Sequence, residues 1–201
     1  IKSEDLRQKV REKRIGNTFL FVVDASGSMG ARERMRAVKG AIFYMLQEAY
    51  QKRDRVGMVA FRRQKAELLL PITRSVDLAQ KCLAEMPTGG KTPLADGLST
   101  ALVTLGMLNK KDSELEPILI LVTDGRANAI EENSGDPVES ALKMAEKIRK
   151  AKITSVVIDT ETDFIKLGVA KAVAKAMGAT YYSLRSLSQE QILRIVRNLD
   201  V

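Results

Sequence analysis

The chain has no histidine, no tryptophan and only one cysteine among its 201 residues. The lack of histidine excludes Ser-His and Cys-His catalytic pairs and any His-ligated zinc site. The single cysteine, Cys82, cannot form a disulfide within the chain. Because Cys82 shares a helical face with Leu78 and Leu83, we expect its thiol to be buried and unreactive. Enzymes that depend on these histidine-containing sites are therefore excluded, and so are extracellular adhesion domains that are stabilised by internal disulfides.

Long hydrophobic runs are also missing. The longest ones, Phe19 to Val23 and Ile118 to Val122, are far too short to span a bilayer, and no signal-peptide pattern opens the sequence. We therefore expect a cytoplasmic protein without a membrane span. Because the sequence begins at Ile1 rather than at a methionine, we also expect that it was excised from a longer protein.

Aromatic residues are scarce, at 4%, and basic residues exceed acidic ones by 33 to 25, which gives a formal net charge of +8. The positive charge favours an acidic partner, for which Lys143, Lys147 and Lys150 form one helical face. Nucleic acid is not the expected partner, because no aromatic residues are interleaved with the basic ones for base stacking. Residues 1–14 are expected to be a basic lead-in, with a docking segment as the alternative, and residues 15–201 to form one domain.

Short β-rich runs alternate with helical patterns, which is typical of a doubly wound α/β sheet with helices on both faces. The predicted strands are Thr18–Val23, Arg55–Phe61, Ala66–Leu70, Ile118–Thr123, Thr154–Asp159 and Thr180–Ser183. The predicted helices are Arg34–Gln51, Val76–Glu85, Pro93–Leu105, Val138–Ala151, Ile165–Met177 and Ser188–Asn198. The connection "RRQK" between the second and third strands is too short for a parallel crossover. We therefore expect a mostly parallel sheet whose third strand is antiparallel at the edge.

Several residues mark the ends of these elements. Ser75 and Ser188 are placed to cap helices, Pro93 suits a first helical position, and Gly178 suits a helix end. Two segments without periodicity, "NKKDSELEP" from residue 109 and "RANAIEENSGDP" from residue 126, are predicted to be loops.

The stretch "VVDASGSM" runs from a predicted buried strand into Asp24, Ser26 and Ser28, which are spaced two residues apart. Alternate residues of an extended segment point the same way, so these three oxygen-bearing side chains can converge. One carboxylate and two hydroxyls are hard ligands that suit Mg²⁺ and suit zinc or iron poorly. The alternative is an Asx or Ser turn that caps the next helix.

Two further residues extend this pattern. Thr92 in "GGKTPL" directly precedes Pro93 at a predicted helix start, and Asp124 in "LVTDG" follows a predicted strand. Open α/β sheets bind ligands at the carboxyl ends of their strands, so neighbouring strands before Asp24 and Asp124 would bring the oxygens to one edge. The residues of the predicted metal site are Asp24, Ser26, Ser28, Thr92 and Asp124.

Two catalytic alternatives do not fit the sequence. "GGKT" is similar to the end of a phosphate-binding loop, but Glu85 stands where G-x-x-x-x-G-K-[ST] needs its first glycine. We expect instead that Gly89 and Gly90 let the backbone pass close to the ion. Ser26 is a poor nucleophile without histidine, and Gly-x-Ser-x-Gly is absent. We therefore predict no catalytic residue.

The pattern D-x-S-x-S, then Thr, then Asp resembles the metal-ion-dependent adhesion site (MIDAS) of von Willebrand factor A domains, and every position of that pattern matches. In that family the serines and the threonine ligate the ion, and the aspartates bind it directly or through water. The resemblance assigns these roles to Ser26, Ser28, Thr92, Asp24 and Asp124. It implies a Rossmann-like, doubly wound fold and Mg²⁺ as the cofactor, with Mn²⁺ or Ca²⁺ as substitutes in vitro.

Longer stretches are similar to the C-terminal domain of D-type magnesium-chelatase subunits: "SEDLRQKVREKRIGNTFLFVVDASGSMG", "YQKRDRVGMVAFR", "ELLLPITRSVDLAQKCL", "PTGGKTPLADGL" and "VTDGRAN". The resemblance implies a Mg²⁺-dependent protein-interaction domain of the ATP-dependent complex that inserts Mg²⁺ into protoporphyrin IX in (bacterio)chlorophyll biosynthesis. It implies two partners: the AAA+ ATPase subunit, bound through an acidic residue, and the porphyrin-binding catalytic subunit. Two alternatives stay open. They are a cobalt-chelatase-like subunit, and a site that delivers its own metal to porphyrin beside Ala129 and Ile130.

Overall fold

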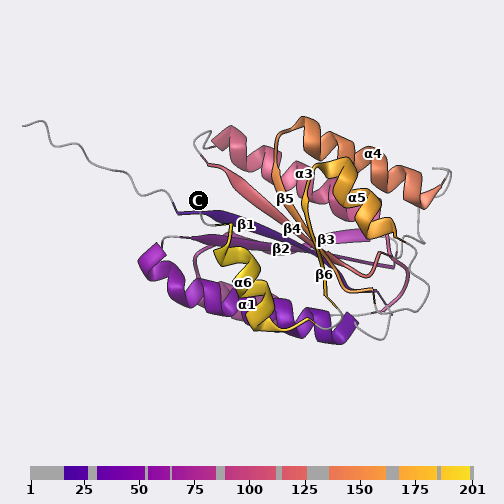
Figure 1. Ribbon diagram of the computed structural model, residues 1–201. Helices are drawn as coiled ribbons and strands as arrows, with labels where there is room; N and C mark the ends of the chain where they lie inside the picture. The colour runs from indigo at the N-terminus through magenta and orange to yellow at the C-terminus, as the bar shows by residue number, and fades with distance from the viewer. Residues whose placement is uncertain are drawn as a thin grey trace, which may run out of the picture.

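The structure is a computed structural model that describes residues 16–26, 31–52, 54–63, 65–84, 89–111, 115–125, 136–161, 168–184 and 187–199. Within these residues, six strands form one sheet in the order β3-β2-β1-β4-β5-β6 (Figure 1). They are β1 (Thr18–Asp24), β2 (Arg55–Arg62), β3 (Lys65–Thr73), β4 (Pro117–Thr123), β5 (Thr154–Asp159) and β6 (Thr180–Ser183). β2 and β3 pair antiparallel, and the other neighbours pair parallel. The predicted sheet is confirmed, and each predicted strand lies within an observed one.

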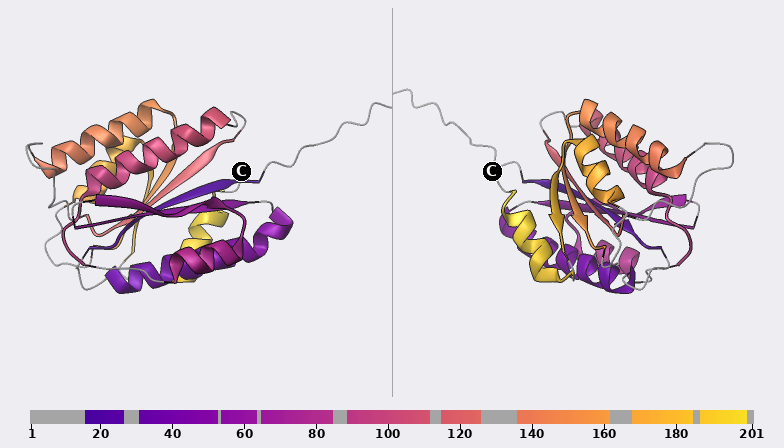
Figure 2. Two further views of the ribbon diagram at one scale, coloured as in Figure 1. Left: turned by 180° about the vertical axis from the view of Figure 1, so that it is seen from behind. Right: turned by 45° about the vertical axis from the view of Figure 1, so that its right-hand side comes forward.

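Helices cover both faces of the sheet, as Figures 1 and 2 show. One face carries α1 (Ala31–Lys52), α2 (Val76–Leu83) and α6 (Gln189–Arg197), and the other carries α3 (Leu94–Lys111), α4 (Pro137–Lys150) and α5 (Val169–Met177). Alternate residues of β1 contribute to the hydrophobic cores on the two faces of the sheet. Phe19 and Phe21 pack on the α1 side, whereas Leu20 and Val22 pack on the α3 side. Among the described residues, no helix is long and apolar enough to cross a membrane.

The predicted capping residues act at the ends of three helices. The Ser75 hydroxyl accepts a hydrogen bond from Leu78 N at the start of α2. Ser188 forms a capping box with Gln191 at the start of α6. Gly178 ends α5 with a left-handed φ of 67°, a conformation that a glycine adopts without steric cost.

Helix α3 is longer than predicted. It begins at Leu94, one residue after Pro93, and continues to Lys111, so the predicted loop from residue 109 starts later than expected. Lys110 in the last turn favours the extension, because a cation complements the negative end of the helix dipole. The other predicted loop (residues 126–135), the lead-in (residues 1–14) and the predicted helix start at Ile165 lie outside the described residues.

The environment of Cys82 differs from the prediction. Leu83 is fully buried, but Cys82 is half-buried and Leu78 is 37% exposed. The expectation of a buried thiol is therefore wrong. The physical reason is the position of α2, which packs beside β3, the edge strand of the sheet, where the hydrophobic layer ends.

Candidate metal site

Asp24 and Asp124 lie at one edge of the sheet, at the carboxyl ends of two neighbouring strands. Asp24 is the last residue of β1, and Asp124 follows Thr123, the last residue of β4, which pairs parallel with β1. The chain leaves β1 through α1 on one face toward β2, and it leaves β4 through α4 on the other face toward β5. The two connections diverge here, and open α/β sheets bind ligands in the crevice at such a point.

Asp24 is fully buried, and its two carboxylate oxygens have different partners. Oδ1 accepts a 2.8 Å hydrogen bond from the Ser26 backbone N–H, so Asp24 forms an Asx turn, whereas residues 27–30, through which it would cap the next helix, lie outside the described residues. Oδ2 accepts from the Thr123 hydroxyl over 3.4 Å. Burial, followed by the negative charge of Asp124, raises the pKa of Asp24 to about 6, while Arg34 and the Ser26 N–H act in the opposite direction.

A buried arginine that the sequence did not point to lies between the two aspartates. Arg34, near the start of α1, is only 3% exposed. Its guanidinium lies 3.4 Å from Asp124 Oδ2 and 3.9 Å from Asp24 Oδ2. Its Nε donates to the Asp24 carbonyl over 3.4 Å, and its Nη1 donates to Thr160 Oγ1 over the same distance. The two acidic side chains therefore meet around one cationic group.

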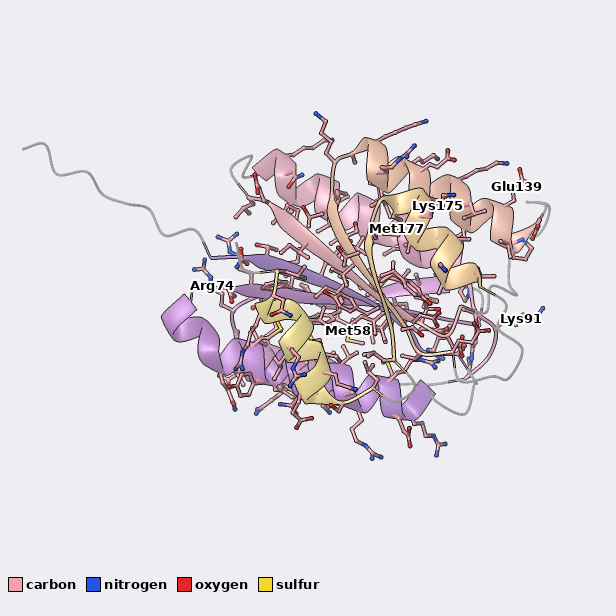
Figure 3. All side chains as sticks on the ribbon, in the orientation of Figure 1. Met58, Arg74, Lys91, Glu139, Lys175 and Met177 are labelled. Atoms are coloured by element: carbon pink, nitrogen blue, oxygen red, sulfur yellow. The ribbon has the colours of Figure 1, made fainter. Side chains whose placement is uncertain are left out.

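The loop before α3 brings Thr92 to the same end of the sheet. Gly89 N donates a 2.8 Å hydrogen bond to the carbonyl of Ala25, the residue after β1. Gly89 and Gly90 have φ angles of 120° and 96°, which residues with a side chain rarely adopt. Thr92 itself is 1% exposed. Figure 3 shows the adjacent Lys91 at the end of the sheet where the strands finish.

The structure describes four of the predicted ligands, and Ser28 lies outside the described residues. Ser26, like Thr92, is buried. Within the described part of the chain, no group of three or more His, Cys, Asp or Glu side chains could hold a metal. An ion at this edge would therefore rely on hydroxyl oxygens as well as on Asp24 and Asp124. This donor set fits Mg²⁺, because hard divalent ions prefer oxygen ligands and because the two carboxylates already face a cation, the guanidinium.

The end of β5 adds polar residues that sequence reasoning missed. Thr160 N and Oγ1 both donate to the Thr123 carbonyl, at 2.9 and 3.2 Å, and tie β5 to β4. Asp159 accepts from Glu161 N over 2.8 Å and from the Tyr181 hydroxyl. Burial and the bond to Asp159 raise the pKa of Tyr181 to about 12. One pattern could have revealed them: "VVIDTE" places an acid after an apolar strand, as "FVVDAS" does.

The sequence model of the von Willebrand factor type A domain matches residues 19–127. The chain belongs to the von Willebrand factor type A family. The matched segment begins in β1, ends just past Asp124 and includes Thr92, so it covers all the positions of the predicted site.

Several relatives match this chain over most of its length. An uncharacterized protein of Methanocaldococcus jannaschii is 43% identical over 86% of this chain and 99% of its own length. The magnesium-chelatase 67 kDa subunit of Chlorobaculum parvum is 36% identical over 96% of this chain and 32% of its own length. The magnesium-chelatase 60 kDa subunit of Cereibacter sphaeroides is 38% identical over 92% of this chain and 33% of its own length. The predicted similarity to magnesium-chelatase subunits is confirmed, and the chain spans about a third of those two proteins.

Solved structures share the fold. The conserved hypothetical protein BatB from Bacteroides thetaiotaomicron superposes with a TM-score of 0.67 at 20% identity, covering 92% of this chain and 97% of its own. The vWF domain of the type V pili tip protein Mfa5 from Porphyromonas gingivalis has a TM-score of 0.67 at 12% identity, covering 91% and 95%. At these identities the likeness concerns the architecture alone.

Proposed function

We propose that this von Willebrand factor type A domain is a Mg²⁺-dependent protein-interaction domain with a chelatase-related role, as part of a magnesium-chelatase subunit. The observation that carries the proposal is the meeting of Asp24 and Asp124 around one cationic group where the strand connections diverge. The 36–38% identity to magnesium-chelatase subunits supports the choice of assembly. The domain, residues 15–201, is proposed to be non-catalytic. Insertion of Mg²⁺ into protoporphyrin IX would belong to the whole ATP-dependent complex in the cytoplasm.

The residues proposed to hold the ion are Asp24, Ser26, Ser28, Thr92 and Asp124. When bound, Mg²⁺ supplies a coordination position that a carboxylate from a partner can fill, and Mn²⁺ or Ca²⁺ would substitute for it in vitro. The two aspartates contribute at most two negative charges and the hydroxyl residues contribute none, so a divalent ion gains from one further acidic ligand. This need for an outside carboxylate is the proposed basis of partner binding.

The task of the chain itself is to hold its oxygens in place. The bond from Ser26 N fixes Asp24 Oδ1, and the bond from Gly89 N to the Ala25 carbonyl holds the loop of Thr92 against the end of β1. The side chains of Asp24 and Thr92 are buried, so water does not compete for their oxygens. Asp24 and Thr92, two of the proposed donors, are therefore held in place before an ion binds.

The proposed partner is the AAA+ ATPase subunit, which would contribute the carboxylate, with the porphyrin-binding catalytic subunit as a second partner. The net charge of +8 favours the approach of an acidic surface. Lys143 contributes little to this attraction, because its charge is paired: Lys143 Nζ lies 2.8 Å from Glu139 Oε1, one helical turn away, and both side chains are largely exposed. The hydrogen bond to Glu139 also raises the pKa of Lys143. Lys147 and Lys150 on α4 are the better candidates for steering.

A site that delivers its own ion to porphyrin needs a large apolar pocket beside it. A cavity of about 430 Å³ is lined by Tyr44 of α1 and by residues of α6. Tyr44 lies ten residues after Arg34, which is about 15 Å along the helix, so this cavity is remote from the site. Ala129 and Ile130, the apolar residues expected near the ion, lie outside the described residues. The interaction role is therefore preferred to metal delivery, and a cobalt-chelatase-like subunit would use the domain in the same way.

The test is capture of the purified ATPase subunit by the domain in Mg²⁺ and in EDTA, together with Mg²⁺ calorimetry. We expect the domain to capture the ATPase subunit in Mg²⁺ and not in EDTA. Thr92→Val replaces a hydroxyl by a methyl of similar size and should weaken both Mg²⁺ binding and capture. Thr104→Val is the matched control, because the Thr104 hydroxyl only donates to the Thr100 carbonyl within α3.

Circular dichroism must show that both valine variants are folded. Capture that is equal in EDTA would refute the proposal, and so would a folded Thr92→Val variant that binds Mg²⁺ as the wild type does. If Mg²⁺ binds but no partner is captured, the metal site stands and the interaction role fails.

A further inference from the structure

Arg34 is an unusual residue to find at a proposed cation site, because it already brings a positive charge there. Its side chain is only 3% exposed. Arginine is rarely buried this deeply unless it is paired with acidic groups. The guanidinium lies 3.4 Å from Asp124 Oδ2 and 3.9 Å from Asp24 Oδ2, so it faces one carboxylate oxygen of each. Bonds to the Asp24 carbonyl and to Thr160 Oγ1 hold it there from two strand ends.

We propose that Arg34 is a built-in counter-ion of this site, which stabilises the metal-free domain and weakens the binding of Mg²⁺. The inference rests on the proposed metal-dependent function. It adds a positioning and regulating residue that lies outside the MIDAS pattern.

The stabilising half follows from burial and charge. Without Arg34, Asp24 and Asp124 would be two buried carboxylates side by side, each costly to keep ionised. The guanidinium offsets this repulsion because it lies between their Oδ2 atoms. The metal-free site should therefore depend on Arg34 for its shape, and removal of one carboxylate should lessen that dependence.

The proposed weakening of Mg²⁺ binding by Arg34 follows from the same distances. A Mg²⁺ ion bound directly to Asp124 Oδ2 would lie about 2.1 Å from that oxygen, and hence within roughly 6 Å of Arg34 Nη1, which is 3.4 Å from the same oxygen. Even at the dielectric constant of water, a double and a single positive charge at that distance repel by the equivalent of about tenfold in affinity. The two aspartates and Arg34 together carry a net charge of −1, so the ion meets half the charge that the aspartates alone would offer.

The experiment compares wild type, Arg34→Met and Arg36→Met. Methionine keeps a long apolar stem without charge, and Arg36 is an exposed arginine two residues along the same helix. Urea unfolding in EDTA, followed by circular dichroism, should show a midpoint lower by roughly 1 M for Arg34→Met and unchanged for Arg36→Met. Mg²⁺ calorimetry should show about tenfold tighter binding for Arg34→Met and little change for Arg36→Met.

Further variants guard against a simple loss of folding. Arg34→Lys keeps the charge, so its Mg²⁺ affinity should stay close to that of the wild type. If Arg34→Met is unfolded in EDTA, Mg²⁺ should refold it, and the double variant Arg34→Met with Asp24→Asn should be folded without metal. If neither happens, Arg34 is only a packing residue and the inference fails.

The two proposals fail in different ways. If the wild type does not bind Mg²⁺ in the calorimeter, the proposed function is wrong, whatever Arg34 does in EDTA. If the wild type binds Mg²⁺ and Arg34→Met binds it equally or more weakly, the proposed function stands and the counter-ion role is overturned, because Arg34 then does not oppose the ion.

Discussion

Gly97, in the first turns of α3, permits the close contact between that helix and β2. A Cβ atom at this position would lie 2.6 Å from Phe61 Cδ1 and 2.9 Å from Phe61 Cγ. Replacing a helical glycine by alanine normally stabilises by roughly 0.5–1 kcal/mol, but overpacking of a core typically costs about 1–3 kcal/mol. Because Phe61 is itself fully buried, it cannot swing away freely. We expect Gly97→Ala to lower the free energy of unfolding by up to about 2.5 kcal/mol, which is the overpacking cost less the gain in helix propensity.

The same helix contains a matched control. Gly106 is exposed, and no atom lies within 4 Å of the position that its Cβ would take. Gly106→Ala should therefore raise the free energy of unfolding by roughly 0.5–1 kcal/mol. Urea unfolding followed by far-ultraviolet circular dichroism suits the chain, which has no tryptophan. If both substitutions stabilise the domain equally, the inferred contact between α3 and Phe61 does not exist.

The substitution also links packing to the candidate site. α3 begins two residues after Thr92, so pushing the helix away from β2 displaces the loop that carries this hydroxyl. Gly97→Ala should weaken Mg²⁺ binding in calorimetry, and Gly106→Ala should leave it unchanged. Unaltered Mg²⁺ affinity in a measurably destabilised Gly97→Ala variant would show that Thr92 is positioned by its loop alone.

Three further predictions concern charge and capping. In metal-free buffer, burial and Asp124 raise the pKa of Asp24 from 3.8 to about 6, so stability is lost as the pH rises through this range. Relative to Asp24→Asn, the wild type should lose up to about 3 kcal/mol of unfolding free energy between pH 4 and pH 7, and equal pH profiles would contradict this. Ser188→Ala should cost about 1 kcal/mol in urea unfolding, because it removes the capping box of α6, and no loss would mean that the box is dispensable. Lys143→Ala should leave the urea midpoint unchanged at low and at high salt, because its pair with Glu139 is exposed, and a clear drop at low salt would show that this pair contributes to stability.

The elements of the fold were predictable because their signals are local. The run "TFLFVV" is apolar enough for a strand covered on both faces, and "RRQK" is too short for anything but a hairpin. The order of the strands is not a local property. The pairing of Val23 with Val122 joins residues about 100 positions apart, and the sequence supported it only indirectly, because neighbouring strands would bring Asp24 and Asp124 to one ligand site.

Arg34 escaped prediction because "ARERMR" looks like a solvated helix start with alternating charges. Arg32 and Arg36 are indeed exposed, whereas Arg34 is buried. A pattern in the sequence does distinguish it: Arg34, Val38 and Ala41 recur at positions i, i+4 and i+7, which places Arg34 on the stripe that faces the sheet. What periodicity could not supply is its partners, because Asp124 comes from a distant strand.

Three aspartates lie at the ends of buried strands at this edge of the sheet, and their oxygens have different partners. Asp159 accepts one hydrogen bond from Glu161 N, two residues along the chain, and one from the Tyr181 hydroxyl, and the bond from Tyr181 links β5 to β6. Asp24 and Asp124 instead share a guanidinium through their Oδ2 atoms at 3.9 and 3.4 Å, whereas charge-assisted hydrogen bonds are usually about 2.7–2.9 Å long. A compact ion that contacts oxygen at about 2.1 Å can interact with such carboxylates more closely than a planar guanidinium does. The proposed divalent cation would therefore gain more at the ends of β1 and β4, where the connections that follow them diverge, than at the end of β5.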